Sequence, residues 1–175
     1  AAFTATSAAC VTGLVVQDTA TYWSFWGQAI ILVLIQIGGM GVVTAAAVLS
    51  AIAGRRIGLA QRSVMQEAIS APQIGGIVRI TKFSVKMMAS IETLGAILLI
   101  VPFCREFGVL RGAWYAVFHS VSSFCNAGFD LMGVKEHFSS LVSYVGHPVV
   151  NITVMLLIIS GGIGFMTWDD IRTRG

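Results

Sequence analysis

Residues 6–19 read T-S-A-A-C-V-T-G-L-V-V-Q-D-T, and residues 122–131 read S-S-F-C-N-A-G-F-D-L. When Gly13 is placed on Gly128, the two stretches share the pattern Ser-x-x-Cys-x-x-Gly-apolar. In both places the pattern ends a short apolar stretch, and a long apolar run containing Gly-Gly-x-Gly follows it. The glycines of these two runs are Gly38, Gly39 and Gly41, then Gly161, Gly162 and Gly164. The chain therefore contains a repeated unit of short helix, glycine turn and long helix.

The composition is that of a membrane protein. Of the 175 residues, 56% are hydrophobic and only 11% are charged, whereas a soluble domain carries about 25% charged residues. The formal net charge of +3 is too small to indicate a nucleic-acid partner. The three cysteines, Cys10, Cys104 and Cys125, lack metal-binding spacing, and we interpret them as small apolar residues. We expect an all-α integral membrane protein in contact with membrane lipid.

Long charge-free runs mark the expected membrane spans. The first is predicted at residues 30–53, which are apolar enough to cross a hydrocarbon core that takes about 20 residues. A second span is predicted at residues 87–101, ending at Pro102 and Cys104, before Arg105. A third is predicted at residues 148–168, where it meets two aspartates. These three segments would be the long helices of the two repeats.

The apolar stretch at residues 113–124 differs from the three spans. As a helix its 12 residues would measure about 18 Å, too short for a core of about 30 Å. It also carries four polar side chains, which a protein-lined cavity tolerates and lipid does not. They are His119, Ser120, Ser122 and Ser123. We therefore expect this stretch to enter the membrane and return to the side it came from.

Basic residues set the expected orientation. They crowd residues 55–86 against a single acid, Glu67, and such a connection faces the cytoplasm. Within it, residues 61–70 would also suit an interfacial helix that touches anionic lipid or a regulatory partner. We therefore divide the chain into repeat one at residues 1–54, a cytoplasmic connection at residues 55–86, and repeat two at residues 87–175.

The repeated unit suits the passage of a cation. A short helix that ends inside the membrane directs the negative end of its dipole, roughly −0.5 charge, at the cavity. Carbonyls that follow the helix can replace the water around a dehydrated cation, and glycine permits the positive φ that turns them to an axis. Asp18 and Asp130 lie just beyond the turns, where negative charge would concentrate cations at the pore mouth.

Several motifs resemble those of one transporter family. The first turn is followed by I-Q-I-G-G-M-G at residues 35–41 and G-R-R-I-G-L-A-Q-R at residues 54–62. Repeat two adds N-A-G-F-D-L at residues 126–131 and G-G-I-G-F at residues 161–165. In this order they resemble the membrane subunit of Ktr-type potassium transporters, in the Trk/Ktr/HKT superfamily. The resemblance covers the whole chain.

The resemblance implies a function and a setting. It implies four such repeats around one pore, each giving a glycine to a selectivity filter. It also implies potassium uptake, sodium-dependent in Ktr systems, by a homodimer in the bacterial plasma membrane. A cytoplasmic nucleotide-binding ring would regulate the pore. The protein would be no enzyme, and it would bind no cofactor and no metal ion beyond the transported K⁺ and a possible coupling Na⁺.

The resemblance also assigns the filter positions. Gly13 and Gly128 occupy those of repeats one and two, and glycine at the first is similar to potassium-selective members. The expected ion ligands are the backbone carbonyls of Val11, Thr12, Gly13, Asn126, Ala127 and Gly128. The outer helix of repeat one, the third and fourth repeats and the gating loop of the third are missing. We therefore expect the chain to be part of a longer transporter.

Simpler interpretations remain for several of these residues. Asp18 would serve equally as a helix cap, because Thr19 and Thr21 follow it. The glycines of the two long helices are expected to be close-packing positions rather than ion ligands. Glu92, an acid in an apolar span, is expected to make a structural hydrogen bond to a neighbouring helix, far from both turns.

Two other functions stay open at the level of sequence. One is a non-conducting membrane scaffold or assembly subunit, which ion flux would distinguish from a transporter. The other is an intramembrane hydrolase built on His119 and the serines beside it. No acid nearby would orient that histidine, and no nucleophile motif is present.

Overall fold

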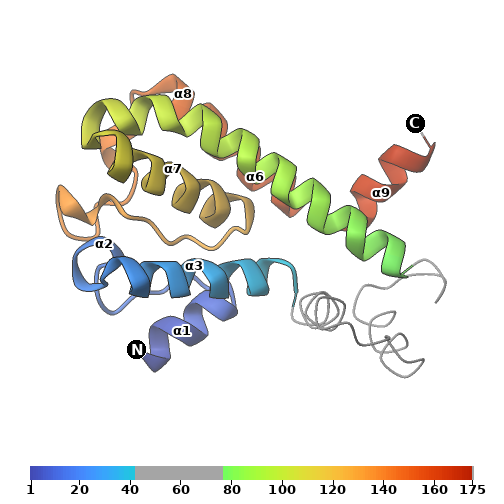
Figure 1. Cartoon of the computed structure of the whole chain (residues 1–175), viewed down its shortest axis with the longest axis horizontal. Coiled ribbons are helices and arrows are strands. Elements are labelled where there is room, and N and C mark those ends of the chain that lie inside the picture. Colours follow the sequence, from blue (N-terminus) through green and yellow to red (C-terminus); the bar gives the residue numbers. More distant parts are fainter. Residues whose placement is uncertain (42–76, 175) are drawn as a thin grey trace.

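The computed structural model describes residues 1–41 and 77–174, and Figure 1 shows the path of the chain. This described part contains helices and loops and no β-strand, which confirms the predicted all-α class. Predictions for residues 42–76, including the rest of the first span, the motif at 54–62 and the interfacial helix at 61–70, lie outside it. The α-helices are α1 (Ala2–Ala9), α2 (Thr19–Tyr22), α3 (Phe25–Gly39), α6 (Ile77–Phe107), α7 (Val109–Phe124), α8 (Pro148–Gly162) and α9 (Phe165–Arg174).

The longest of the described helices is α6, whose 31 residues extend about 46 Å. Its segment Thr81–Phe107 is long and apolar enough to cross a membrane, alone among the described helices. The prediction that this span ends at Pro102 is wrong, because the helix continues to Phe107. Phe103, with no exposed surface, packs against the rings of His119 and Tyr144, and this packing outweighs the loss of one backbone hydrogen bond at proline. Gly108 ends the helix with φ +80°.

The two Gly-Gly-x-Gly segments end helices α3 and α8, each of which has 15 residues. Gly41 and Gly164, the last glycine of each motif, have φ +78° and +84°. A left-handed residue ends an α-helix. The predicted single span at residues 148–168 is therefore wrong, since α9 begins at Phe165 after a break.

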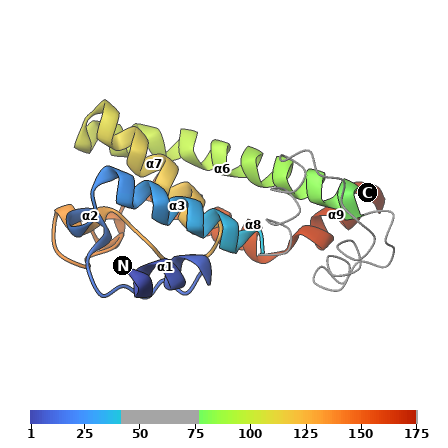
Figure 2. The ribbon, with the colours of Figure 1, turned by 60° about the horizontal axis from the view of Figure 1, so that its bottom comes forward.

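The short helices α1 and α7 have 8 and 16 residues. Helix α7 begins four residues before the predicted start, yet at about 24 Å it remains too short to cross the membrane. α1 packs against α3, and α7 packs against α6, α8 and α3. In Figures 1 and 2, α1 lies on the side of α3 that faces away from α6. Each short helix thus lies beside a longer one.

The core of the described part belongs mainly to repeat two. Phe118 of α7 and Leu99 and Phe103 of α6 have no exposed surface, and Leu131 and Met132 of the following loop close over them. Helix α7 approaches α6 so closely that a side chain on Gly112 would lie 2.5 Å from the backbone of Cys104. The second turn is therefore mounted on a rigid helical hairpin.

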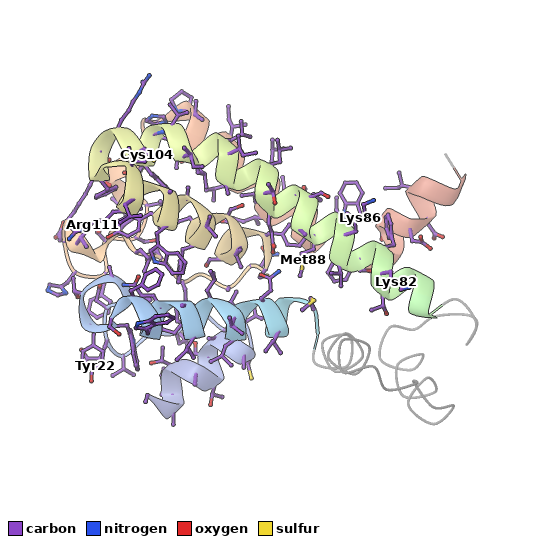
Figure 3. All side chains as sticks on the ribbon, in the orientation of Figure 1. Tyr22, Lys82, Lys86, Met88, Cys104 and Arg111 are labelled. Carbon is purple, nitrogen blue, oxygen red and sulfur yellow. The ribbon has the colours of Figure 1, made fainter. Side chains whose placement is uncertain are left out.

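The beginning of α6 carries lysines without acids beside them, whereas its end carries one basic and one acidic residue. Figure 3 shows Lys82 and Lys86 at its beginning and Cys104 near its other end, where Arg105 is followed by Glu106. Tyr22 of repeat one lies toward this second end. The beginning of α6 also lies within the segment that the sequence assigns to the basic connection. This distribution agrees with a cytoplasmic start and an external end of α6.

Candidate functional site

The two short helices end in backbone turns of the same form. In each turn three successive amides donate hydrogen bonds back to the short helix at aligned positions. In repeat one these bonds are Cys10 to Thr6 (2.8 Å), Val11 to Ala8 (3.2 Å) and Thr12 to Ser7 (2.8 Å). In repeat two they are Cys125 to Val121 (2.9 Å), Asn126 to Ser123 (3.1 Å) and Ala127 to Ser122 (2.8 Å). The repeat seen in the sequence is thus a repeat in structure.

Both turns contain two residues in the left-handed region. Val11 and Asn126 have φ +55° and +56°, and Gly13 and Gly128 have φ +76° and +72°. Left-handed φ is unusual for asparagine and a clear outlier for a β-branched valine. Strain of this kind costs on the order of 1–3 kcal/mol and is concentrated at functional sites. The prediction of glycine at positive φ in each turn is confirmed.

The two turns meet each other. A β-carbon added to Gly13 would lie 2.6 Å from the carbonyl oxygen of Ala127 and 3.4 Å from the α-carbon of Gly128. A β-carbon on Gly128 would lie 3.5 Å from the α-carbon of Gly13. The structure therefore brings together the two glycines that the sequence singled out. The contact leaves no space for a side chain at Gly13.

Glycines of α3 and α8 pack directly behind the turns. A β-carbon on Gly38 would collide with the carbonyl of Ala9, and one on Gly161 would collide with the carbonyl of Phe124. A β-carbon on Gly39 would meet the sulfur of Cys125. The close-packing interpretation is confirmed for these three glycines. Gly41, Gly162 and Gly164 have no such neighbour in the described part of the chain, and for them close packing stays a prediction.

Side chains of α7 brace the second turn. The Ser122 hydroxyl donates to the Phe129 carbonyl at 2.6 Å. His119 Nε2 accepts from the Leu131 amide at 3.3 Å, and its Nδ1 lies 2.7 Å from the Tyr115 carbonyl, to which it donates. His119 is 2% exposed, and both of its ring nitrogens are used. It therefore holds the loop after the turn and has no nitrogen available as a catalytic base.

The two predicted mouth carboxylates have different surroundings. Asp18 caps α2 by accepting from the Ala20 and Thr21 amides at 2.9 and 3.0 Å. It also accepts from the Phe138 amide of repeat two at 3.0 Å. Burial raises the pKa of Asp18, but the hydrogen bonds from Phe138 and Thr21 outweigh it and hold the pKa below its usual value. The cap interpretation is confirmed, and Asp18 also joins the two repeats.

Asp130 lies beside the second turn with fewer partners. One oxygen accepts from the Met132 amide at 2.9 Å, and the residue lines a cavity of about 240 Å³ with Asn126 and Gly128. Burial raises the pKa of Asp130, and the charge of Asp18 raises it further, against the effect of the Met132 bond. The site thus disfavours the ionised form unless a cation is near.

Glu92 lies closer to the turns than its place in the sequence suggests. Its carboxylate accepts from Gln36 of α3 at 3.1 and 3.0 Å, which confirms the predicted hydrogen bond to a neighbouring helix. The expectation that it lies far from both turns is wrong, because the Cys125 sulfur is 3.9 Å from Oε1. The packing of α6 along α7 brings the middle of α6 to the end of the short helix. Gln36, a polar residue in an apolar run, was the signal for this contact.

Two short helices whose glycine turns are in contact, in an all-helical membrane protein, are the arrangement that the sequence led us to expect of a cation transporter with pore loops. A comparison with protein families agrees, since the family described as "Cation transport protein" (TrkH) matches residues 1–174. The chain belongs to this family. It is therefore an integral protein of the plasma membrane.

The more specific comparisons are with uptake proteins. The chain is 42% identical over 171 residues to the potassium/sodium uptake protein NtpJ of Enterococcus hirae and to the Ktr system potassium uptake protein B of Bacillus subtilis. It is 38% identical over 171 residues to the Ktr system potassium uptake protein B of Vibrio alginolyticus. The alignment covers 98% of the chain and 37% of each of the first two proteins. The resemblance to the Ktr-type subunit is thereby confirmed.

Proposed function

We propose that this chain supplies two adjacent sectors of the selectivity filter in a potassium uptake transporter. The ion would be held by the backbone carbonyls of six residues, three from each turn. They are Val11, Thr12, Gly13, Asn126, Ala127 and Gly128. The observation that carries the proposal is the contact between two turns of identical backbone form at the ends of two short helices.

The hydrogen bonding of the turns supports this role. Their amides are used inward, toward the short helices, as described above. Within the described residues, no donor forms a hydrogen bond to any of the six carbonyls. Of these six residues Ala127 is buried and the other five are partly or fully exposed, so their carbonyls are accessible and can replace water around a cation. Both helix dipoles add negative potential at the same place.

The surroundings support Asp130, more than Asp18, as the residue of the mouth. Asp18 is fully engaged in joining the repeats, whereas the second oxygen of Asp130 has no partner among the described residues. The raised pKa of Asp130 agrees with a carboxylate whose charge awaits a cation. We therefore propose that Asp130 attracts cations to the pore and that Asp18 shapes it.

The wider assembly rests on the relatives. By analogy with proteins named for a Ktr system and for potassium and sodium uptake, we propose sodium-dependent transport without enzymatic activity or a bound cofactor. The transporter would be a homodimer regulated by a cytoplasmic nucleotide-binding ring. The chain spans little more than a third of these relatives. The remaining repeats would complete the pore.

A chimera tests the proposal. This chain would replace the aligned segment of the Bacillus subtilis Ktr system potassium uptake protein B, and uptake of K⁺ and Na⁺ would be measured in cells without other potassium uptake. The chimera should take up K⁺ in preference to Na⁺. Gly13→Ser and Gly128→Ser should each reduce that preference by about tenfold or more, because a side chain at positive φ disturbs the carbonyls. Unchanged selectivity in both variants, or a chimera that assembles without conducting, would contradict the proposal and favour a scaffold.

A further inference from the structure

Glu92 is an acid near the middle of the only described helix that is long and apolar enough to span a membrane. It is 8% exposed. A buried carboxylate needs partners, because an unpaired charge in a medium of low dielectric constant is strongly unfavourable. Among the described residues, no basic side chain forms an ion pair with it. Its partners are neutral donors.

These partners come from two other helices, α3 and α7. Gln36 Nε2 of α3 donates to both carboxylate oxygens, at 3.1 and 3.0 Å. The Cys125 thiol, at the end of α7, donates to Oε1 at 3.9 Å. The Ser120 hydroxyl of α7 donates to the backbone carbonyl of Glu92 at 2.7 Å. One residue of α6 thus joins α3 of repeat one to α7 of repeat two.

The position of Cys125 connects Glu92 and its partners to the second turn. Cys125 ends α7, and the residue after it is Asn126, the first of the left-handed residues in the second turn. A shift of Cys125 therefore moves the turn directly. Gly39 of α3 also packs on the Cys125 sulfur, so the cysteine is held from two sides. Cys10, its counterpart in repeat one, is exposed and has no acid beside it in the described part of the chain.

We propose that Glu92 is a positioning residue for the second filter turn, acting through Cys125 and anchored to repeat one by Gln36. This inference rests on the proposed function, since it assumes that the turn binds the ion. The carboxylate suits the task because it is an acceptor only. A glutamine at position 92 would turn one of its two acceptor atoms into a donor, so Gln36 loses one of its two bonds and faces an amino group instead. If that amino group takes the place of Oε1, Cys125 loses its acceptor as well.

The test uses the chimera and measures KM and maximal rate for K⁺ and Na⁺, together with the amount of protein in the membrane. Glu92→Gln should raise the KM for K⁺ by about tenfold and reduce the preference over Na⁺, at near-normal abundance. Thr93→Val is the matched control. Thr93 is exposed on the same helix and bonds only to the Ala89 carbonyl of its own helix, so this variant should behave as the parent.

A double exchange separates positioning from charge. When Gln36→Glu is combined with Glu92→Gln, the amide on α6 can donate to the carboxylate that now stands on α3. The oxygen of the same amide still accepts from the Cys125 thiol, so this variant should recover most of the K⁺ preference. Cys125→Ser should keep it, since serine retains a donor, and Cys125→Ala should lose it as Glu92→Gln does.

Three results would overturn the inference. The first is that Glu92→Gln behaves like the Thr93→Val control. The second is that the double exchange fails to recover selectivity. The third is that only the amount of protein falls while both KM values stay the same. The serine variants at Gly13 and Gly128 distinguish this failure from that of the proposed function. If they alter selectivity and Glu92→Gln does not, only the role of Glu92 is wrong. If they do not alter it, the filter itself is wrong.

Discussion

The turns of repeats one and two share a backbone and differ in what supports it. In repeat two, Ser122 braces the turn by donating to the Phe129 carbonyl. Ser7, the aligned serine in repeat one, has a buried hydroxyl with no partner among the described residues. There, the Thr12 hydroxyl donates to the Ser7 carbonyl at 3.3 Å instead. The same contrast holds for His119, which binds the loop after its turn, and the aligned Thr4, for which the described structure has no such bond.

This difference shows which features make the turn and which hold it. The end of a short helix, a left-handed residue and a glycine are common to both repeats, so they suffice to define the backbone. The braces that Ser122 and His119 form have no counterpart among the described residues of repeat one, so they stabilise the turn without defining it. Changes to the shared features should therefore impair both repeats alike, and changes to the braces should impair only the second.

The largest expected effect concerns orientation, which the two repeats should share. We expect a cysteine at Arg56 to be protected from an impermeant thiol reagent in intact cells, and one at Glu136 to react. The basic connection should face the cytoplasm, and the loop after the second turn should face outward. The native cysteines would first be replaced, Cys125 by serine to keep its donor. Labelling of residue 56 without labelling of residue 136 would contradict this topology and indicate the opposite orientation.

His119→Ala should be the most damaging change to a brace. It leaves the Leu131 amide and the Tyr115 carbonyl without their partner and opens a cavity, at a cost of about 3 kcal/mol. The aligned change, Thr4→Ala, should cost only about 1 kcal/mol, because it removes a small side chain without a described hydrogen bond. Thermal unfolding of the purified chimera in detergent measures both. Equal losses would mean that the repeats are braced equally.

Ser122→Ala should cost about 1 kcal/mol, because the Phe129 carbonyl loses its donor. Ser7→Ala is the matched control in repeat one. It should be neutral or slightly stabilising, since it removes a buried hydroxyl that has no partner in the described structure. The same unfolding assay compares the two variants. A larger loss for Ser7→Ala would show that repeat one has a brace that its described contacts do not reveal.

An effect of similar size, present only above acidic pH, concerns Asp18, which joins the repeats. Asp18→Asn should cost about 1 kcal/mol at pH 7, because an amide group would face the Phe138 amide. The folded-state pKa of Asp18 is lowered, so its stabilisation is present above the usual value of 3.8 and is lost as the pH falls below it. The Tm difference between parent and variant should therefore shrink at about pH 3. Glu136→Gln, an exposed change in the same loop, should show no difference at either pH.

The sequence predicted the turns well because their determinants are local. The shared pattern around Gly13 and Gly128 specifies a helix end and a positive φ, and both are present. The family resemblance, which implies repeats around one pore, agrees with the contact between the two glycines. The local sequence pattern predicted helix ends wrongly where the packing of side chains or a single glycine determines them. Pro102 lies within α6 because Phe103 beyond it is buried, and Gly164 breaks the last predicted span although the run around it is apolar.

Contacts between repeats could not be predicted from local pattern. The sequence showed Glu92 as an isolated acid, but its position beside Cys125 depends on how α6 and α7 pack. Asp18 likewise gave equal support to a cap and a mouth residue, and only its bond to Phe138 shows that it joins the repeats. These are long-range contacts, for which a short pattern carries no information.

The central claim is that the carbonyls of the two turns together hold the transported ion. Crystals of the chimera grown with rubidium, which substitutes for potassium and scatters anomalously, test it most directly. We expect an anomalous peak in direct contact with carbonyl oxygens of both turns, next to Gly13 and Gly128, and its loss in Gly13→Ser. A peak elsewhere in the protein, with none between the turns of a conducting chimera, would contradict the claim.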